Sequence, residues 1–94
     1  MKITEVLEVV KETQKSAELA EAQGKREAVV VFASYIRGLF QSTTVGERYE
    51  DFVPSYLEFL TTATIEEIQR SIENIIWALE QEVASTRRTI GFGI

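Results

Sequence analysis

Apolar residues recur at three- and four-residue steps along the last third of the chain. They stand at positions 65, 68, 72, 75, 79 and 83, with Ile76 alongside. Because an α-helix completes a turn every 3.6 residues, this spacing places them on one face of a helix. We predict a helix over residues 65–88 that begins after a capping box formed by Thr64 and Glu67. Its apolar face needs other helices to cover it, from the same chain or from a second copy.

A narrower apolar face runs along residues 3–23. Gly24 follows it, as glycine often does after the last residue of a helix, and Lys25 and Arg26 carry positive charge that suits a helix C-terminus. We therefore predict an amphipathic helix and a short antiparallel connection. The residues of its apolar face are Ile3, Val6, Leu7, Val10, Thr13, Ala17 and Ala20.

Residues 25–41 permit two interpretations. The β-branched run at residues 29–31, followed by Phe32, would suit a strand. The length of the segment and its helical spacing favour a helix, with Ser34 and Arg37 off the apolar face. We predict this helix to be the central element, covered on more than one side, and keep the strand as the alternative. Gly38 either lets another helix cross closely or costs about 1 kcal/mol as a tolerated weak spot.

A third helix is expected over residues 45–61, with Pro54 inside it. Proline has no N–H to donate and clashes with the preceding turn, so the helix should be kinked or broken there. Thr44 and Glu47 fit a capping box at its start. The residues expected to pack inward after the break are Tyr56, Leu57, Phe59 and Leu60.

Together these segments predict an all-α, four-helix bundle-like fold in a single domain, residues 1–94. Residues 89–94 differ from the rest because they alternate apolar residues with glycine. We predict that they form an extended tail that is too flexible for a helix. Such a tail either frays and folds back on its own chain, or acts as a strap that binds a neighbouring chain.

The chain contains no histidine and no cysteine. Nucleophiles of the Ser-His-Asp or Cys-His type, structural zinc sites and the common di-iron bundle sites all need one of these side chains. We therefore expect no enzyme, no catalytic residue, no cofactor and no metal ligand. The lack of disulfides is compatible with a reducing cytoplasm. The longest apolar run, residues 28–33, is far shorter than the roughly 20 residues of a membrane span, and the first residues lack the apolar centre of a signal peptide. We expect a cytoplasmic protein.

The acidic residues leave one enzymatic alternative open. Glu18-x-x-Glu21 and Glu47-x-x-Glu50, with Asp51 adjacent, are similar in order and separation to acids of the MazG-like nucleoside triphosphate pyrophosphohydrolases. Those all-α enzymes bind magnesium through paired carboxylates, as hard cations prefer. The resemblance implies a magnesium-dependent nucleotide pyrophosphohydrolase if the five acids converge. The first motif lacks its extra paired glutamate, the second lacks a final Asp, and acids near residue 47 also suit a helix N-terminal region.

A second alternative is a small nucleic-acid-binding or regulatory protein. Lys25, Arg26 and Arg37, together with Arg87 and Arg88, could form a basic surface. The net charge of −5 and the absence of a helix-turn-helix signature or basic region argue against it.

The interpretation we favour is a non-catalytic protein–protein interaction or scaffolding module that self-associates through its C-terminal helix. A second copy would be its partner, in a homodimer or higher oligomer, and another protein is also possible. Trp77 lies off the main stripe of that helix, and tryptophan is enriched where proteins bind each other. The residues that we predict at the interface are Ile68, Ile72, Ile75, Ile76, Trp77, Leu79 and Phe92.

Overall fold

The computed structural model describes the backbone of residues 2–49 and 56–92, and the burial of side chains in residues 2–48 and 56–85. Every regular element in these ranges is an α-helix, which confirms the all-α class and removes the strand alternative for residues 29–32. The helices are α1 (Ile3–Ala22), α2 (Arg26–Gln41), α3 (Thr44–Tyr49), α4 (Tyr56–Thr62) and α5 (Ile65–Phe92).

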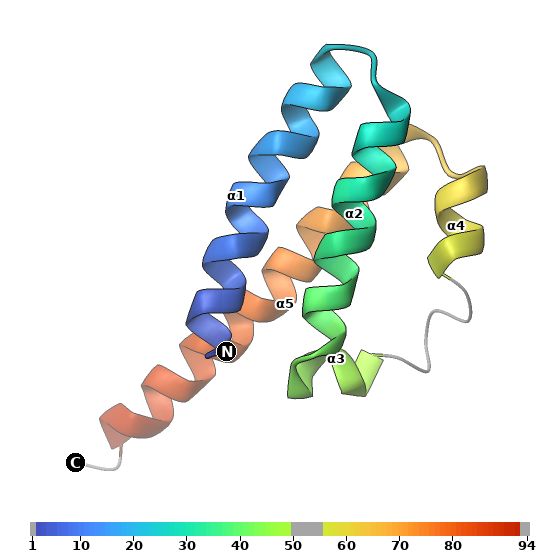
Figure 1. Cartoon of the computed structure of the whole chain (residues 1–94). Helices are drawn as coiled ribbons and strands as arrows, with labels where there is room; N and C mark the ends of the chain where they lie inside the picture. The colour runs from blue at the N-terminus through green and yellow to red at the C-terminus, as the bar shows by residue number, and fades with distance from the viewer. Residues whose placement is uncertain (1, 50–55, 93–94) are drawn as a thin grey trace.

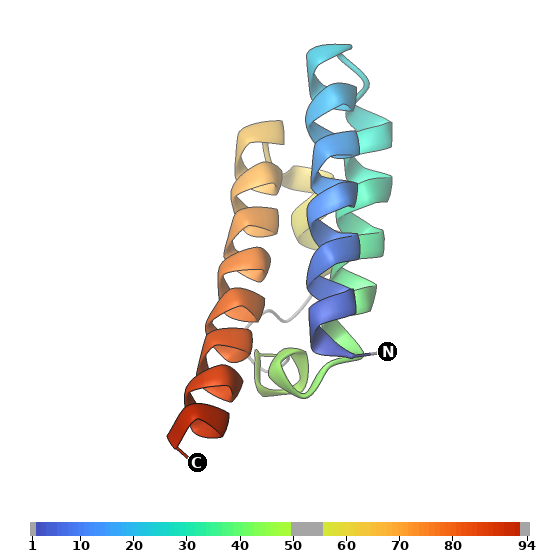
Figure 2. The same cartoon turned by 90° about the vertical axis from the view of Figure 1, so that its left-hand side faces the viewer.

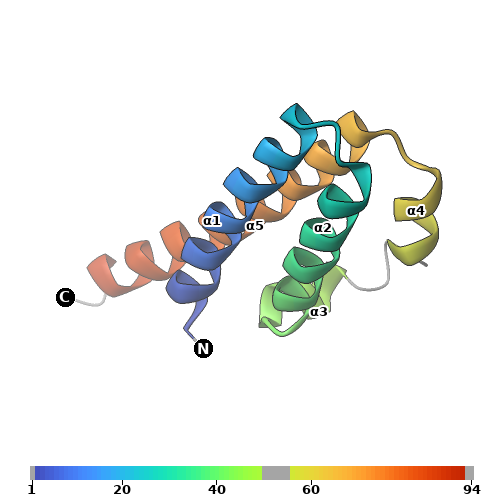
Figure 3. The same cartoon turned by 45° about the horizontal axis from the view of Figure 1, so that its top comes forward.

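Three long helices form the body of the molecule. α1 and α2 make an antiparallel hairpin, and α5 packs against both of them (Figures 1 and 2). α3 lies at the far end of α2 and contacts α5, whereas α4 stands on the outer side of α2 (Figure 3). The arrangement is bundle-like, with two short helices where the sequence predicted a third helix that is kinked or broken.

The turn between α1 and α2 depends on Gly24. This residue has a φ of 71°, in the left-handed region that glycine enters without steric cost. Its N–H donates to the Glu21 carbonyl at 2.9 Å, and the Lys25 N–H donates to the Ala20 carbonyl at 2.9 Å. These two bonds form a Schellman motif, which satisfies carbonyls at the end of α1. The prediction that Gly24 ends the first helix is confirmed.

Thr43 joins α2 to α3. Its hydroxyl donates to the Phe40 carbonyl at 2.6 Å and accepts the Gly46 N–H at 3.0 Å, so one side chain serves both helix ends. The N-cap of α3 is therefore Thr43, and the predicted capping box of Thr44 and Glu47 is wrong by one residue. The reason is geometric, because the chain must turn directly after α2 for α3 to reach α5.

Gly46 allows α3 to approach the end of α2. A Cβ atom at this position would overlap the Phe40 carbonyl oxygen and would lie 2.6 Å from the Phe40 carbonyl carbon and 2.9 Å from the Gln41 Cα. Only glycine fits there without moving the backbone. Gly38 behaves differently, since a Cβ there would meet no atom within 4 Å. Among the described residues, no other helix crosses closely at Gly38, so this residue is a weak spot in α2.

The third predicted helix, over residues 45–61 and kinked or broken at Pro54, is present as two helices, α3 and α4. Pro54 lies in the stretch 50–55, outside the described residues. In α4 the expected inward packing holds for Leu60, which is 1% exposed, and in part for Tyr56 and Phe59. It is wrong for Leu57, which is 72% exposed. A helix of seven residues has room for only one buried face.

α5 begins as predicted and ends later than predicted. The Glu67 N–H donates to the Thr64 hydroxyl at 3.1 Å, and the Thr64 N–H donates to Glu67 Oε1 at 3.3 Å, which confirms the capping box. The helix continues through Phe92 instead of stopping at Arg88, so residues 89–92 are helical where we expected an extended tail. Extending an existing helix costs far less than starting one, and a single Gly91 opposes it by only about 1 kcal/mol. Residues 93–94 lie outside the described residues.

The core lies between α1, α2 and α5 and is almost entirely aliphatic. The predicted face of α1 is buried at Val6, Val10, Ala17 and Ala20 and partly buried at Ile3, Leu7 and Thr13. α1 and α5 cover α2 on more than one side, as expected, although Val31 is 64% exposed and Tyr35 52% exposed. Lys11 of α1 adds a surface ion pair with Glu80 of α5 at 3.4 Å, a contact that contributes at most about 1 kcal/mol. The largest fully buried side chains are Ile36, Leu60, Ile68, Ile72, Leu79, Val6, Val10 and Val29.

Candidate functional site

The predicted interface residues of α5 have two different environments. Ile68, Ile72 and Leu79 are 0% exposed, and Ile75 and Ile76 are nearly so, because α1 and α2 of the same chain cover them. Trp77, by contrast, is 60% exposed. The side chain of Phe92 lies outside the described residues. Within a single chain, Trp77 is therefore the described member of the predicted set that is available for a partner.

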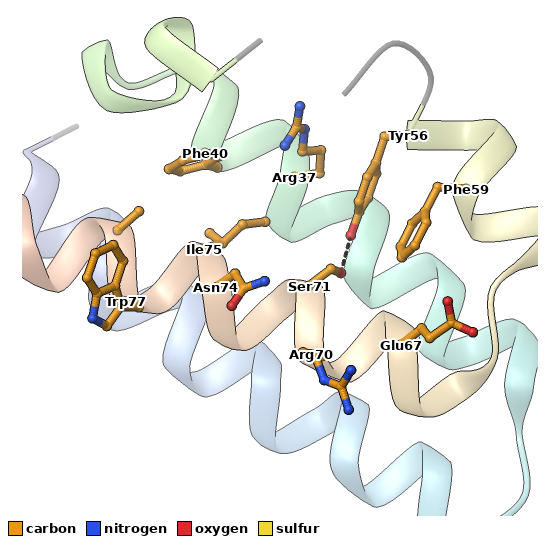
Figure 4. Close-up of a pocket in the computed structure, with 11 residues that line it drawn as sticks. Arg37, Phe40, Tyr56, Phe59, Glu67, Arg70, Ser71, Asn74, Ile75 and Trp77 are labelled. Carbon is orange, nitrogen blue, oxygen red and sulfur yellow. Dashed lines mark hydrogen bonds between the residues drawn. The ribbon is translucent and has the colours of Figure 1, made fainter. Parts of the chain in front are cut away.

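Next to Trp77, a groove of about 610 Å³ opens between α2, α4 and α5. Aromatic and aliphatic side chains form most of its walls, and Figure 4 shows them converging from the three helices. The side chains that define the groove are Arg37, Phe40, Tyr56, Phe59, Ile75 and Trp77.

Arg37 is the unusual residue of this groove. It is only 8% exposed, and its Nε atom has no hydrogen-bond partner in the part of the chain that the structure describes. No described carboxylate forms an ion pair with it within 4.0 Å. Its guanidinium instead lies 5.1 Å from the centre of the Tyr56 ring and 6.0 Å from that of Phe40 (Figure 4). Arg37 is thus a buried cation whose described neighbours are aromatic rings.

Tyr56 is fixed beside Arg37 by a short hydrogen-bond chain. The Ser71 hydroxyl donates to the Ile68 carbonyl at 2.6 Å, so its one proton is already used. The Tyr56 hydroxyl, 3.0 Å from Ser71 Oγ, must therefore be the donor in that bond. Burial raises the pKa of the Tyr56 phenol above its ordinary value, while Ser71 and the charge of Arg37 act in the opposite direction. Tyr56 is therefore a neutral donor near pH 7, and its ring stacks on Phe59 with centroids 5.6 Å apart.

A second arginine holds α4 in place as the outer wall of the groove. Arg26 at the start of α2 donates from Nη2 to the Ala63 carbonyl at 2.6 Å and to the Leu60 carbonyl at 3.2 Å. These carbonyls lie at the C-terminal end of α4, where positive charge is favourable. The sequence predicts Arg26 at the C-terminal end of α1, whereas the structure places its charge at the C-terminal end of α4.

The other charged groups at the groove are already engaged or exposed. Glu67 is bound in the capping box with Thr64. Arg70 lies at the rim, 3.8 Å from Glu66, and both side chains are largely exposed. Among the described residues, the buried charge of the groove is therefore that of Arg37.

The acids of the magnesium alternative do not meet among the described residues. Glu18 and Glu21 lie near the C-terminal end of α1, whereas Glu47 lies on α3, at the opposite end of the hairpin (Figure 1). Glu50 and Asp51 are outside the described residues. Over residues 2–49 and 56–92, no group of three or more acidic side chains is placed to hold a metal ion.

The basic residues of the nucleic-acid alternative are also separated. Lys25 is exposed, Arg26 binds the end of α4, and Arg37 is buried at the groove. The side chains of Arg87 and Arg88 lie outside the described residues.

Sequence reasoning assigned Arg37 to the polar side of its helix and so missed the groove. One signal pointed the other way, because Arg37 follows Ala33 by four residues and precedes Phe40 by three. These three residues share one face of the helix, and both apolar neighbours are buried. The position of Tyr56 in the groove, by contrast, depends on where α4 packs.

Comparison with protein-family models, curated proteins and solved structures finds no match for this chain. None of the helices in the described part combines the length and the apolar character that crossing a membrane requires.

Proposed function

We propose that this chain is a non-catalytic helical protein–protein interaction or scaffolding module that self-associates through α5, with a second copy of the chain against the Trp77 face. The observation that carries the proposal is the exposure of Trp77, 60% in the single chain. Tryptophan supplies a large apolar area with an N–H that can bond across an interface. The cytoplasm, which suits a cysteine-free chain, is the compartment that we assign to it.

The shape of α5 supports the same proposal. This helix has 28 residues, compared with 20 in α1 and 16 in α2, and its C-terminal end extends past the hairpin (Figures 1 and 3). A helix end without neighbours is marginally stable in water, because most helix stability in proteins comes from packing. A second copy that packs along α5 would stabilise this end.

Charge does not supply the attraction between two copies, because each carries a net charge of −5 and like charges repel. The apolar contact at Trp77 has to outweigh this repulsion, and Arg70 is a local basic group on the same rim of the groove. Small helical domains also gain stability from association, since one modest core contributes few kcal/mol.

Trp77→Lys tests the proposal. Lysine at this position can pair with Glu73 four residues earlier, so α5 stays stable while the apolar contact is lost. We expect sedimentation equilibrium to show an oligomer for the unmodified chain and at least a tenfold weaker association for the variant, since a tryptophan at a binding hot spot contributes about 2 kcal/mol or more.

Tyr35→Gln is the matched control, because Tyr35 is 52% exposed but lies on α2, outside the groove. It should leave the mass unchanged. An unmodified chain that stays monomeric at every concentration would disprove self-association. An oligomer that tolerates Trp77→Lys would place the contact elsewhere.

A further inference from the structure

We propose that the groove between α2, α4 and α5 binds a small amphipathic carboxylic acid, with its carboxylate on the guanidinium of Arg37. This inference goes beyond self-association, because it concerns a small ligand at the buried part of the groove. Trp77 and Arg70 form the exposed rim, whereas Arg37 is 8% exposed.

The first reason is that Arg37 has no carboxylate partner among the described residues. A buried guanidinium loses hydration, and a protein normally compensates with a carboxylate and several hydrogen bonds. Here Nε is buried without a described acceptor, and the rings of Tyr56 and Phe40 supply a cation–π attraction. A guanidinium offers a planar set of donors that matches the two oxygens of a carboxylate. An anion in the groove would satisfy both the charge and the unused donor.

The composition of the groove indicates which anion fits. One buried positive charge balances one negative charge, so a monocarboxylate fits better than a phosphate dianion, which would leave charge uncompensated beside apolar walls. Phe40, Phe59 and Ile75 offer those walls to an apolar body. The Tyr56 hydroxyl donates to Ser71, while the guanidinium of Arg37 lies over the Tyr56 ring, 5.1 Å from its centre.

The size of the groove agrees with a small ligand. Its volume of about 610 Å³ lies within the roughly 300–1,000 Å³ of small-molecule sites. Such sites are mostly apolar, with a few polar groups that fix the orientation of the ligand. A medium-chain fatty acid or a substituted aromatic acid has the required combination of one carboxylate and an apolar body.

The experiment uses decanoate as the probe, decanamide as its neutral analogue and decyl phosphate as the dianion. Trp77 is the one tryptophan of the chain and lies at the groove, so its fluorescence reports occupancy, and calorimetry gives an independent affinity. We expect decanoate to bind roughly 10–100-fold more tightly than decanamide, as a hydrogen bond to a charged group predicts. Decyl phosphate should bind more weakly than decanoate.

Arg37→Met removes the charge while keeping an unbranched side chain of similar bulk. It should abolish the preference for decanoate over decanamide and leave the affinity for decanamide within about threefold, because the apolar walls stay in place. Arg70→Gln is the matched control, since it removes an exposed guanidinium at the same groove. It should change decanoate binding by less than about threefold.

Three results would overturn the proposal. These are no saturable binding of decanoate, equal affinities for decanoate and decanamide, and an Arg37→Met variant that keeps the preference.

A thermal melt of Arg37→Met checks separately whether Arg37 already has a carboxylate partner within the chain. Removing one member of a buried ion pair lowers the melting temperature of a domain of this size by more than about 12 °C, and such a fall would show that Arg37 is already paired within the chain. Because Arg37→Met leaves Trp77 in place, it should not alter self-association, so the two proposals can fail separately.

Discussion

α2 borders two regions with opposite character. On one side, Ile36 faces a closed core shared with α1 and α5, where mostly aliphatic side chains are buried. On the other side, Arg37 faces an open groove whose walls are mostly aromatic and aliphatic. The charge of Arg37 has no described carboxylate partner there. Two adjacent residues of one helix thus serve different purposes. The closed region stabilises the fold, whereas the open region departs from ordinary packing rules, as binding sites commonly do.

The closed region should respond most strongly to truncation. Ile72 is 0% exposed, so Ile72→Ala removes buried area and leaves a cavity, and we expect a loss of about 2–5 kcal/mol in the free energy of unfolding. Leu57→Ala, at a side chain that is 72% exposed, should change the same quantity by less than about 0.5 kcal/mol. Urea denaturation of both variants measures the contrast. Similar losses of unfolding free energy in the two variants would mean that Leu57 is more closely packed than its exposure indicates.

Gly46 of α3 and Gly38 of α2 should respond differently to an added methyl group. Gly46→Ala places a Cβ against the backbone at Phe40, and we expect a loss of about 1–3 kcal/mol or more. Gly38→Ala meets no atom within 4 Å, so it should gain up to about 1 kcal/mol from better helix propensity. Thermal melts of the pair would show opposite shifts. A higher melting temperature for Gly46→Ala would indicate that α3 does not pack on the end of α2.

The groove should respond to the loss of one hydrogen bond and to high pH. Tyr56→Phe removes the bond to Ser71, which should cost about 0.5–1.5 kcal/mol in the free energy of unfolding near pH 7. Because burial raises the pKa of Tyr56 above 10.0, the unfolded chain loses this proton before the folded one does. The contribution of the group to stability is therefore complete below pH 10.0 and is lost as the pH rises through the folded pKa.

Denaturation at a series of pH values from neutral to above 10.0 tests this linkage. The stability of the unmodified chain should fall relative to that of Tyr56→Phe at the alkaline end. Parallel curves for the two proteins would show that the phenol is not buried against Ser71.

Much of the fold follows from local patterns. The spacing of apolar residues predicts α1 and α5, Gly24 marks the turn, and Thr64 marks the start of the last helix. Each of these signals acts within a few residues, through helix periodicity or through a backbone hydrogen bond at a helix end. The later end of α5 was missed because the two glycines near residue 92 suggested a break, although extending a helix costs little.

The groove could be predicted only in part. Trp77 stood out in the sequence because it lies off the apolar stripe, and it is exposed as that position indicates. Tyr56, Phe59 and Ser71 belong to α4 and α5, which are separated from Arg37 by 19 or more positions. No local pattern states which of these side chains will meet.

What the sequence by itself determined is the helical class, the two longest amphipathic faces and the absence of any histidine or cysteine chemistry. What only the tertiary structure decided is which apolar face is core and which polar residue is buried. From the sequence alone, the isoleucines of α5 could have been contact surface and Arg37 could have been solvated. In the structure α1 and α2 cover the isoleucines, and Tyr56 of α4 lies against Arg37. The physical reason is that hydrophobic burial is not directional, so a sequence specifies that a face must be covered, whereas packing decides by what.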